Sequence, residues 1–433
     1  MPPSVFPTGV TLHDPEKAFG CYVLFDGHAD HTYLIDMNGN VVHSWDYAGW
    51  PSEMIDPAHA NGAKGNVIVQ KEANSFDNKT LLELDWDSKV VWEWGEKAPG
   101  GRANQEHDQA RLPNGNTLVL AYLMNTVPEL SDEPIRDEAI YEVTPEGDLV
   151  WTWISTEHME ELGITEENKQ WLLSPLLRAK RTGVLALNNM APLGPNKWFD
   201  AGDESFHPDN IMIDSRDGCF IAIIEKKTGG IVWRLGPDLP ATHDMSKRTF
   251  VGALPRPVDS ISGQHDAHII APGLQGEGNI LVFDNQGSAG FPPTFLEVFQ
   301  GSRVLEIDPI TKDIVWQYDG SCSGQTFWTF SSTFISSARR LPNGNTLICE
   351  GMHGRLFQVT REGEIVWEYV NPHFQQTVKR DPNTPIVMNT WMTMARKNFV
   401  YRAQPIPYDW VPDTTPRSAT SVVPPSPENF KIG

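Results

Sequence analysis

A two-strand motif built around tryptophan recurs six times along this chain of 433 residues. Each copy has an apolar run, a polar turn containing Gly, Asp or Asn, and a second run with Trp or His at its third position, which is typical of a β-hairpin. The copies include YLIDMNGNVVHSW, YEVTPEGDLVWTW and FQVTREGEIVWEY. The third positions are His43, Trp92, Trp151, Trp233, Trp316 and Trp367. A single hairpin cannot bury both of its faces, so we expect the copies to pack against one another.

A glycine turn and a further strand precede each hairpin, as in GNVIVQ, GNTLVLA, GNILVFD and GNTLICE. The repeating unit is therefore turn, strand, turn, hairpin. Four short strands per unit, repeated radially, describe a β-propeller. We predict an all-β fold, a six-bladed β-propeller with short helical insertions over one face, in which the tryptophans fill the space between blades.

One propeller domain is expected over residues 1–410, with insertions at about 155–205 and 236–262. The first insertion contains a helix-like run that Ser155 or Thr156 would cap. Both insertions precede strands that carry histidine, so they would cover one mouth of the central channel. The Pro- and Ser-rich sequence after Tyr401 should run over the surface or be disordered, with residues 411–433 as the C-terminal tail.

Composition limits the partners of the protein. A formal net charge of −22 repels phosphate backbones, which argues against nucleic acid. The sequence has no run near the roughly 18 apolar residues of a membrane span and no signal peptide. Four separate cysteines suit free thiols. We expect a cytoplasmic protein as written, or a periplasmic or secreted one if a leader was removed, that is a monomer or homodimer.

The strand before each glycine turn should line the central channel, and several of these strands carry polar side chains. They are His59, His107 with Asp108, His207 with Asp209 and Asn210, His265 with Asp266 and His268, and Arg339 with Arg340. Neutral imidazoles can attack, accept a proton or bind a metal, and an adjacent aspartate can orient the ring. His107, His207 and His265 are the candidate ligands of a transition metal. A calcium ion on the axis is an alternative, and we expect no required cofactor.

Four segments resemble the arylsulfotransferase family. They read PTGVTLHDPEKAFGCYVLFDG, HD followed by RLPNGNTLVL, FHPDNIMID followed by TGGIVWRLG, and QHDAHII followed by NILVFDNQG, and they span roughly residues 7–410. The resemblance implies transfer of sulfate between phenols through a sulfohistidine, without a nucleotide donor. His265 matches the nucleophile, His107 a second channel histidine, and His207 the histidine of an H-x-N motif. Asp209 stands at the Asn position, unless Asn210 substitutes for it.

The sequence departs from the family pattern at the strand that resembles ISSRH, whose arginine binds the sulfuryl oxygens. Here the strand reads IAIIEKK, so Glu225 stands at the arginine position with Lys226 beside it. Loss of a charge-assisted arginine contact would weaken anion binding. Lys226, Arg339 or Arg340 would have to replace it, and His268 stands where relatives often have arginine.

Three functions remain open at this point. In sulfuryl transfer on a small aromatic or sulfated substrate, His265 attacks sulfur while Asp266 orients an imidazole and Trp328 holds an aryl ring. A hydrolase, lyase or isomerase would use the same site, with Glu225 as a base or a metal on the histidines. A platform for a partner protein would need no convergent histidines, and we rank it last.

Overall fold

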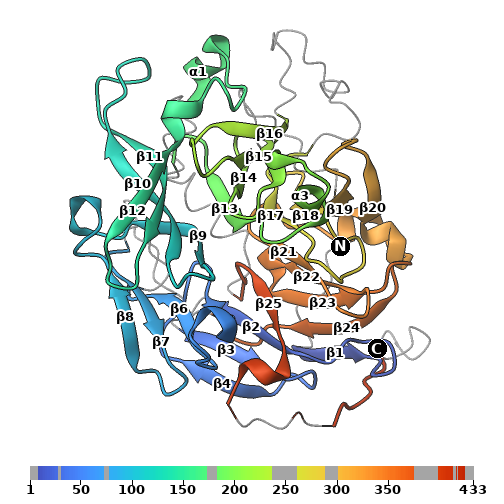
Figure 1. Cartoon of the computed structure of the whole chain (residues 1–433). Helices are drawn as coiled ribbons and strands as arrows, with labels where there is room; N and C mark the ends of the chain where they lie inside the picture. The colour runs from blue at the N-terminus through green and yellow to red at the C-terminus, as the bar shows by residue number, and fades with distance from the viewer. Residues whose placement is uncertain are drawn as a thin grey trace, which may run out of the picture.

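The computed structural model describes residues 8–27, 31–72, 78–172, 183–236, 261–287, 301–374, 398–412, 416 and 418–424. Within them, six antiparallel sheets surround a central axis (Figure 1). Five sheets have four strands and one has five. The protein is a six-bladed β-propeller, as the repeat predicts.

The first three blades follow the chain, and their strands are given from the axis outward. Blade 1 comprises β25 (Ala403–Ile406), β2 (Tyr22–Gly27), β3 (His31–Ile35) and β4 (Val41–Trp45). Blade 2 comprises β5 (Glu53–Met54), β6 (Val67–Gln70), β7 (Leu81–Leu84) and β8 (Val90–Trp94). Blade 3 comprises β9 (Gln105–Arg111), β10 (Thr117–Asn125), β11 (Ile135–Val143) and β12 (Leu149–Ile154).

The other three blades complete the ring. Blade 4 comprises β13 (Leu187–Pro192), β14 (Ile211–Ser215), β15 (Phe220–Ile224) and β16 (Ile231–Leu235). Blade 5 comprises β17 (His265–Ile269), β18 (Ile280–Asp284), β19 (Arg303–Ile307) and β20 (Ile314–Tyr318). Blade 6 comprises β21 (Ser337–Arg340), β22 (Thr346–Glu350), β23 (Arg355–Val359), β24 (Ile365–Val370) and β1 (Gly9–His13).

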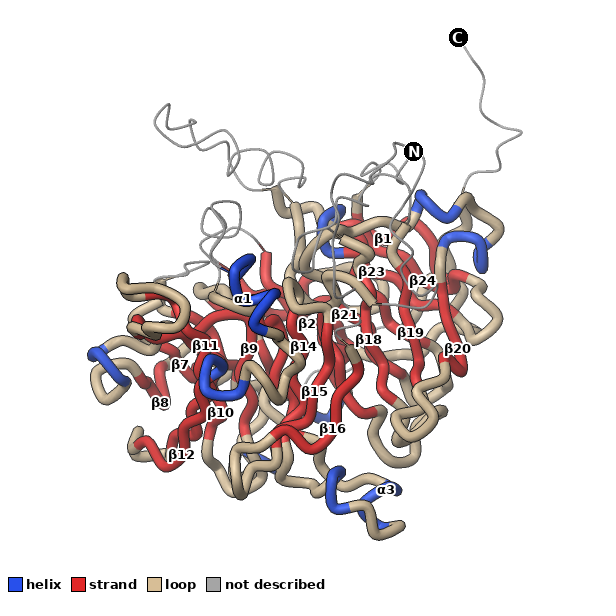
Figure 2. Tube along the Cα trace, turned by 90° about the horizontal axis from the view of Figure 1, so that it is seen from above, coloured by secondary structure: helices blue, strands red, loops and turns tan. Residues whose placement is uncertain are grey.

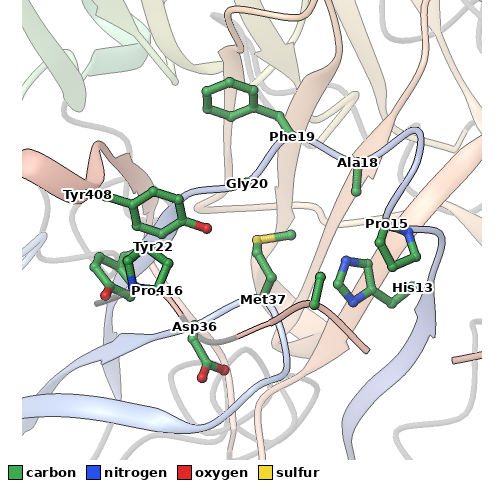
Figure 3. Close-up of a pocket in the computed structure, with 11 residues that line it drawn as sticks. His13, Pro15, Ala18, Phe19, Gly20, Tyr22, Asp36, Met37, Tyr408 and Pro416 are labelled. Carbon is green, nitrogen blue, oxygen red and sulfur yellow. The ribbon is translucent and has the colours of Figure 1, made fainter. Parts of the chain in front are cut away.

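Both ends of the chain contribute a strand that closes the ring. β25 is the innermost strand of blade 1 and pairs with β2, and β1 is the outermost strand of blade 6 and pairs with β24. The expectation of an irregular tail after Tyr401 is therefore wrong for β25, where Pro405 is tolerated because the strand lies at a sheet edge. A cavity of about 60 Å³ lined by His13, Met37 and Tyr408 lies where the terminal segments meet (Figure 3).

The hydrophobic core of the described residues consists mainly of six clusters, one between each pair of neighbouring blades. Five tryptophans also donate an indole N–H to a carbonyl in the outer hairpin turn of the next blade. These bonds join Trp45 to Asp85 (3.0 Å), Trp153 to Gly229 (3.0 Å), Trp233 to Pro309 (2.8 Å), Trp316 to Arg361 (2.8 Å) and Trp367 to Met37 (2.9 Å). Trp233, Trp316 and Trp367 thus join neighbouring blades from the predicted third position, whereas in blades 1 and 3 the bond comes from Trp45 and Trp153, two residues later.

The first predicted insertion contains helices and an inner strand. The elements are η3 (Ser155–His158), α1 (Glu166–Leu172), β13, α3 (Lys197–Asp200) and η4 (Glu204–Phe206). The helical run is confirmed as α1, but Ser155 begins η3, and its hydroxyl donates to Asp137 Oδ1 at 2.9 Å. Figure 2 shows α3 at one end of the propeller. Residues 173–182 and 237–260 of the two insertions lie outside the described residues.

Short 3-10 helices occupy several other connections. They are η1 (Pro57–His59), η2 (Pro99–Gly101), η6 (Gly320–Ser323), η7 (Phe327–Thr329), η8 (Gly351–His353) and η9 (Tyr408–Trp410).

Bulges interrupt the pairing of the inner strands β9, β13 and β17 with their neighbours. At the bulges of β9 and β17, His107 and Asp266 both have a left-handed backbone with φ of 65°. Residues other than glycine rarely adopt this conformation. A bulge turns the adjacent side chains to new directions.

Candidate active site

Successive residues of the inner strands form levels along the axis, because a strand advances about 3.3 Å per residue. The first level comprises His107 and His265 with the ring of Tyr401, and the second comprises Asp108 and Asp266 with Arg402, which pairs with both; Tyr401 and Arg402 directly precede β25. Beyond the second level, the ends of β9, β17 and β21 line a pocket of about 490 Å³, here called the axial pocket. We call His107, His265, Arg216 and Tyr401 the histidine cluster.

Arg402 connects the second level across the channel. Its guanidinium donates to both oxygens of Asp108 at 2.8 and 3.0 Å and to Asn189 Oδ1 at 3.2 Å. It also pairs with Asp266 Oδ1 at 3.1 Å, and Arg339 donates to that oxygen at 2.5 Å. Five blades thus meet in one buried charge network. Asp266, predicted to orient an imidazole, binds two guanidinium groups instead.

His265 is held by hydrogen bonds on both ring nitrogens. Asn285 donates its amide to the carbonyls of Ser332 and Ile335 at 2.6 and 2.8 Å, so its Oδ1 faces His265 Nδ1 as an acceptor at 2.7 Å. Nδ1 therefore carries the proton, and Nε2 has a lone pair, which accepts the Ile335 N–H at 3.1 Å. The imidazole is fixed in the tautomer that presents Nε2 as a nucleophile or base.

Burial and a nearby cation keep both histidines of the cluster neutral. Desolvation and the Arg216 guanidinium lower the pKa of His107 and that of His265 to about 3 each. Arg402 lowers the pKa of His107 further, and His107 does the same for His265. The two imidazoles and Arg216 therefore lie close enough to interact, and neither ring is protonated near neutral pH.

Glu106 stands beside His107, with Oε2 at 3.8 Å from His107 Nδ1. Its side chain is buried, and neither carboxyl oxygen has a hydrogen-bond partner within the described residues. Desolvation, with a contribution from Glu138, raises the pKa of Glu106 to about 8, so this carboxyl holds its proton at neutral pH. Glu106 is therefore a protonated group placed next to a neutral imidazole.

Tyr401 packs between the two histidines, with its ring centroid 6.0 Å from that of His107 and 6.4 Å from that of His265. Its hydroxyl donates to the Asn188 carbonyl at 3.2 Å. Arg216 follows β14 directly and pairs with Asp217 at 2.7 Å. Sequence reasoning did not identify Tyr401, Arg216 or Glu106 as site residues. The sequence MIDSR, which ends in Arg216, was a usable signal because it is similar to ISSR.

Residues 30–402 match the sequence model of the arylsulfotransferase (ASST) family. The chain belongs to this family. No curated protein matches the sequence. Among solved structures, the chain is similar to a protein of unknown function from Bacteroides caccae, with 13% identity, a TM-score of 0.47 and coverage of 90% of this chain and 99% of that chain. It is also similar to hydrazine synthase from Kuenenia stuttgartiensis, with 10% identity, a TM-score of 0.37 and coverage of 77% and 71%.

Glu225 and Lys226, predicted at the arginine position in the channel, lie in an outer turn of blade 4. Glu225 lies in the turn after β15, where it accepts a hydrogen bond from Thr228 at 2.5 Å, and Lys226 pairs there with Glu142 of blade 3. The inner strand of blade 4 is β13, and a long connection separates it from β14. The sequence pattern suggests β15, which leads into Glu225, as the second strand of blade 4. The second strand is instead β14, which leads into Arg216. The cluster thus has an arginine of its own.

The prediction that His207 lines the channel is wrong for the same reason. His207 lies on the connection between β13 and β14, with 42% of its side chain exposed, and its ring packs on Phe199. Asp209 beside it is exposed, and Asn210 caps the loop with bonds to the carbonyls of Glu204 and Ser205. β13 instead begins Leu-Asn-Asn and carries no histidine.

The remaining predicted residues lie away from the histidine cluster. His268, His59, Arg339 and Arg340 line the axial pocket. Trp328 is half exposed on η7, where it packs on Phe327. A metal on His107, His207 and His265 is not supported, since no three His, Cys, Asp or Glu side chains among the described residues are grouped to hold an ion.

For the cysteines and the helices, the sequence predicts free thiols and no membrane-spanning segment. All four cysteines are free, and three of them are buried. None of the helices in the described part of the chain has both the length and the apolar character that crossing a membrane requires.

Proposed function

We propose that this protein transfers a sulfuryl group from an aryl sulfate to a phenolic acceptor through His265, without a nucleotide sulfate donor. The observation that carries the proposal is the fixed tautomer of His265, whose ring lies within electrostatic range of Arg216. A histidine nucleophile needs a proton held on one nitrogen and a lone pair on the other. Asn285 satisfies the first requirement, and membership of the arylsulfotransferase family supports the reaction class.

Arg216 binds the sulfuryl oxygens of the ester. It is the cation that lowers the pKa of both histidines, so it lies within electrostatic range of each ring. Because both imidazoles are neutral near pH 7, Arg216 is the cation of the histidine cluster that an anionic ester would meet. In a buried site, such a charge-assisted contact stabilises the charge that develops in the transition state.

In the first half-reaction, the Nε2 lone pair of His265 attacks sulfur in line with the bond to the aryl oxygen. The S–N bond forms as the S–O bond breaks, and the aryloxide leaves with the bonding electrons. The Ile335 N–H, which caps Nε2 in the free protein, then donates to a sulfuryl oxygen instead. Asn285 continues to accept the Nδ1 proton, which becomes more acidic on the sulfated ring.

His107 and Glu106 together supply the proton that the leaving aryloxide takes up. The aryloxide takes a proton from His107, and the protonated Glu106 replaces it at Nδ1, which leaves a carboxylate. This step requires the 3.8 Å separation to shorten by about 1 Å, to the length of a hydrogen bond. In the second half-reaction the acceptor phenol returns the proton along the same route, and its oxygen attacks sulfur. Atoms and charges balance over the cycle.

The alternative of a hydrolase, lyase or isomerase used the same His/Asp/Glu channel, either with Glu225 as a base or with a metal on His107, His207 and His265. Glu225 lies in an outer turn and His207 on an exposed connection, so the structure favours neither form of the alternative, and we do not propose it.

Two matched sets of variants test the proposal. With 4-nitrophenyl sulfate as donor and phenol as acceptor, Arg216→Gln should lower kcat/KM by about 10²–10³-fold, as expected for loss of one transition-state donor. Glu225→Gln and Lys226→Gln should retain wild-type kcat/KM. The proposal fails if Arg216→Gln is as active as wild type, or if the Glu225 variant loses transfer.

A further inference from the structure

We infer that the axial pocket is a second ligand site, separate from the histidine cluster, that binds a small aromatic acid carrying a hydroxyl group. The pocket has a volume of about 490 Å³, which falls within the range of small-molecule sites. It opens at the end of the propeller that carries α3, since residues just before that helix line it (Figure 2). The Arg402 network lies between it and the histidine cluster.

Three polar groups from three different blades face this pocket. Glu53 is on β5 of blade 2, His268 on β17 of blade 5 and Arg339 on β21 of blade 6. In a six-bladed ring, blades 2 and 5 lie on opposite sides of the axis. A molecule in the pocket would therefore have Glu53 on one side and His268 on the other, with Arg339 between them around the ring and within electrostatic range of Glu53.

The hydrogen-bonding capacity of these groups is only partly used within the described residues. His268 Nδ1 donates to the Asp266 carbonyl at 2.8 Å, so Nε2 is left with a lone pair that needs a donor. One nitrogen of the Arg339 guanidinium donates to Asp266, and 27% of the Arg339 side chain is exposed. Within the described part of the chain, the Glu53 carboxyl makes no hydrogen bond and no ion pair. The pocket thus offers an acceptor, a cationic donor and a carboxyl group.

Arg339 is the cation of the wall that can receive a ligand carboxylate. Desolvation and Asp108 raise the pKa of Glu53 to about 8, so it is protonated at pH 7 and can donate. Arg111, Arg340 and Arg402 also line the pocket, but they are paired with Glu83, Glu306 and Asp108, whereas Arg339 shares Asp266 with Arg402 and keeps nitrogens for a ligand. A ligand carboxylate would accept from Arg339 and Glu53, and a ligand hydroxyl would donate to His268 Nε2.

The rest of the wall is apolar and suits a ring. Met54, Met190, Ile269, Leu274 and Trp410 all line the pocket. Apolar walls with a few convergent polar groups are typical of small-molecule sites, in which the apolar area supplies affinity and the polar groups fix orientation. An aromatic hydroxy acid matches both features.

Calorimetric titration of the full-length protein with 4-hydroxybenzoate tests the inference. We expect saturable binding at pH 7, and weakening by about tenfold or more for the uncharged 4-hydroxybenzamide and for Arg339→Gln. Arg361→Gln is the matched control, because Arg361 is 31% exposed and pairs with buried Glu306 at 2.9 Å, but does not line the pocket. It should bind as wild type does.

The pH dependence gives a second readout that a folding defect would not reproduce. As pH rises through about 8, Glu53 ionises and repels the ligand carboxylate, so affinity should fall in wild type and stay constant in Glu53→Gln. The charged groups around Glu53 are Asp108 and Arg111 of β9, Arg339 and Arg402, and the pocket also contains Asp56, His59, His268 and Arg340.

The outcomes separate this inference from the proposed function. Binding that persists in His265→Ala supports a site independent of sulfuryl transfer. The inference is overturned if 4-hydroxybenzoate does not bind, if Arg339→Gln binds it as wild type does, or if His265→Ala alone removes binding.

Discussion

Removal of the Arg402 guanidinium should destabilise the whole propeller. Arg402 has only 12% of its side chain exposed and pairs with Asp108 and Asp266, both buried. Breaking a buried pair by removing one partner costs about 3–5 kcal/mol, because a charge is left without compensation. For 433 residues, the entropy of unfolding is about 0.9 kcal/mol/K near Tm. Arg402→Gln should therefore lower Tm by about 3–6 °C in a calorimetric scan.

A double-mutant cycle identifies the cause of this loss. Asp108→Asn in the Arg402→Gln background should restore part of the stability, because it removes the Asp108 charge that the single variant leaves unpaired, whereas Asp266 keeps Arg339. Lys97→Gln, which breaks an exposed pair with Asp148, should change Tm by less than about 1 °C. An unchanged Tm in Arg402→Gln, or strictly additive effects of Arg402→Gln and Asp108→Asn, would refute the reasoning about the network.

Three further predictions concern the histidine cluster and the blade contacts. Glu106→Gln should slow transfer from donors with weakly acidic phenols more than from 4-nitrophenyl sulfate. In wild type the rate should fall above about pH 8, where Glu106 loses its proton, and this fall should be absent in Glu106→Gln. His265 has a pKa of about 3 when folded and 6.5 when unfolded, so the unfolded state binds more protons between these values, and stability falls as pH falls. Urea denaturation at pH 7 and pH 4.5 should show a loss about 2–3 kcal/mol larger in wild type than in His265→Asn; equal losses would contradict the assignment. Trp316→Phe removes the bond to Arg361 and should cost about 1 kcal/mol in urea denaturation, whereas Trp328→Phe on the exposed η7 should cost almost nothing.

The fold was largely predictable because its main signal is local. The aromatic position recurs in every hairpin, and the indole of residues such as Trp316 reaches the next blade, so one short motif encodes both the blade and its packing. The closing strand β25 was not predictable in this way. Its sequence, AQPI, has neither alternation nor an aromatic residue, and it forms a strand only because β2 needs a partner on its inner edge.

The site was only partly predictable, because its register depends on non-local structure. His107 and His265 were found from the chain alone, and the structure brings them together around Tyr401. Arg216 was missed because the connection between β13 and β14 is long. The sequence pattern places His207, on that connection, in the inner strand, so it predicts the arginine after β15, at Glu225, and not after β14. Glu106 gave no signal, since only burial in the folded protein makes its carboxyl unusual.

The most direct test of the account is to locate the sulfuryl group on the protein during turnover. The protein is mixed with 4-nitrophenyl sulfate in the absence of an acceptor, quenched, and examined by intact mass and peptide mapping. We predict one sulfuryl group on the peptide that contains His265, lost on addition of phenol and absent in His265→Ala. A sulfuryl group on another residue, or steady transfer by a protein that never carries one, would contradict the mechanism.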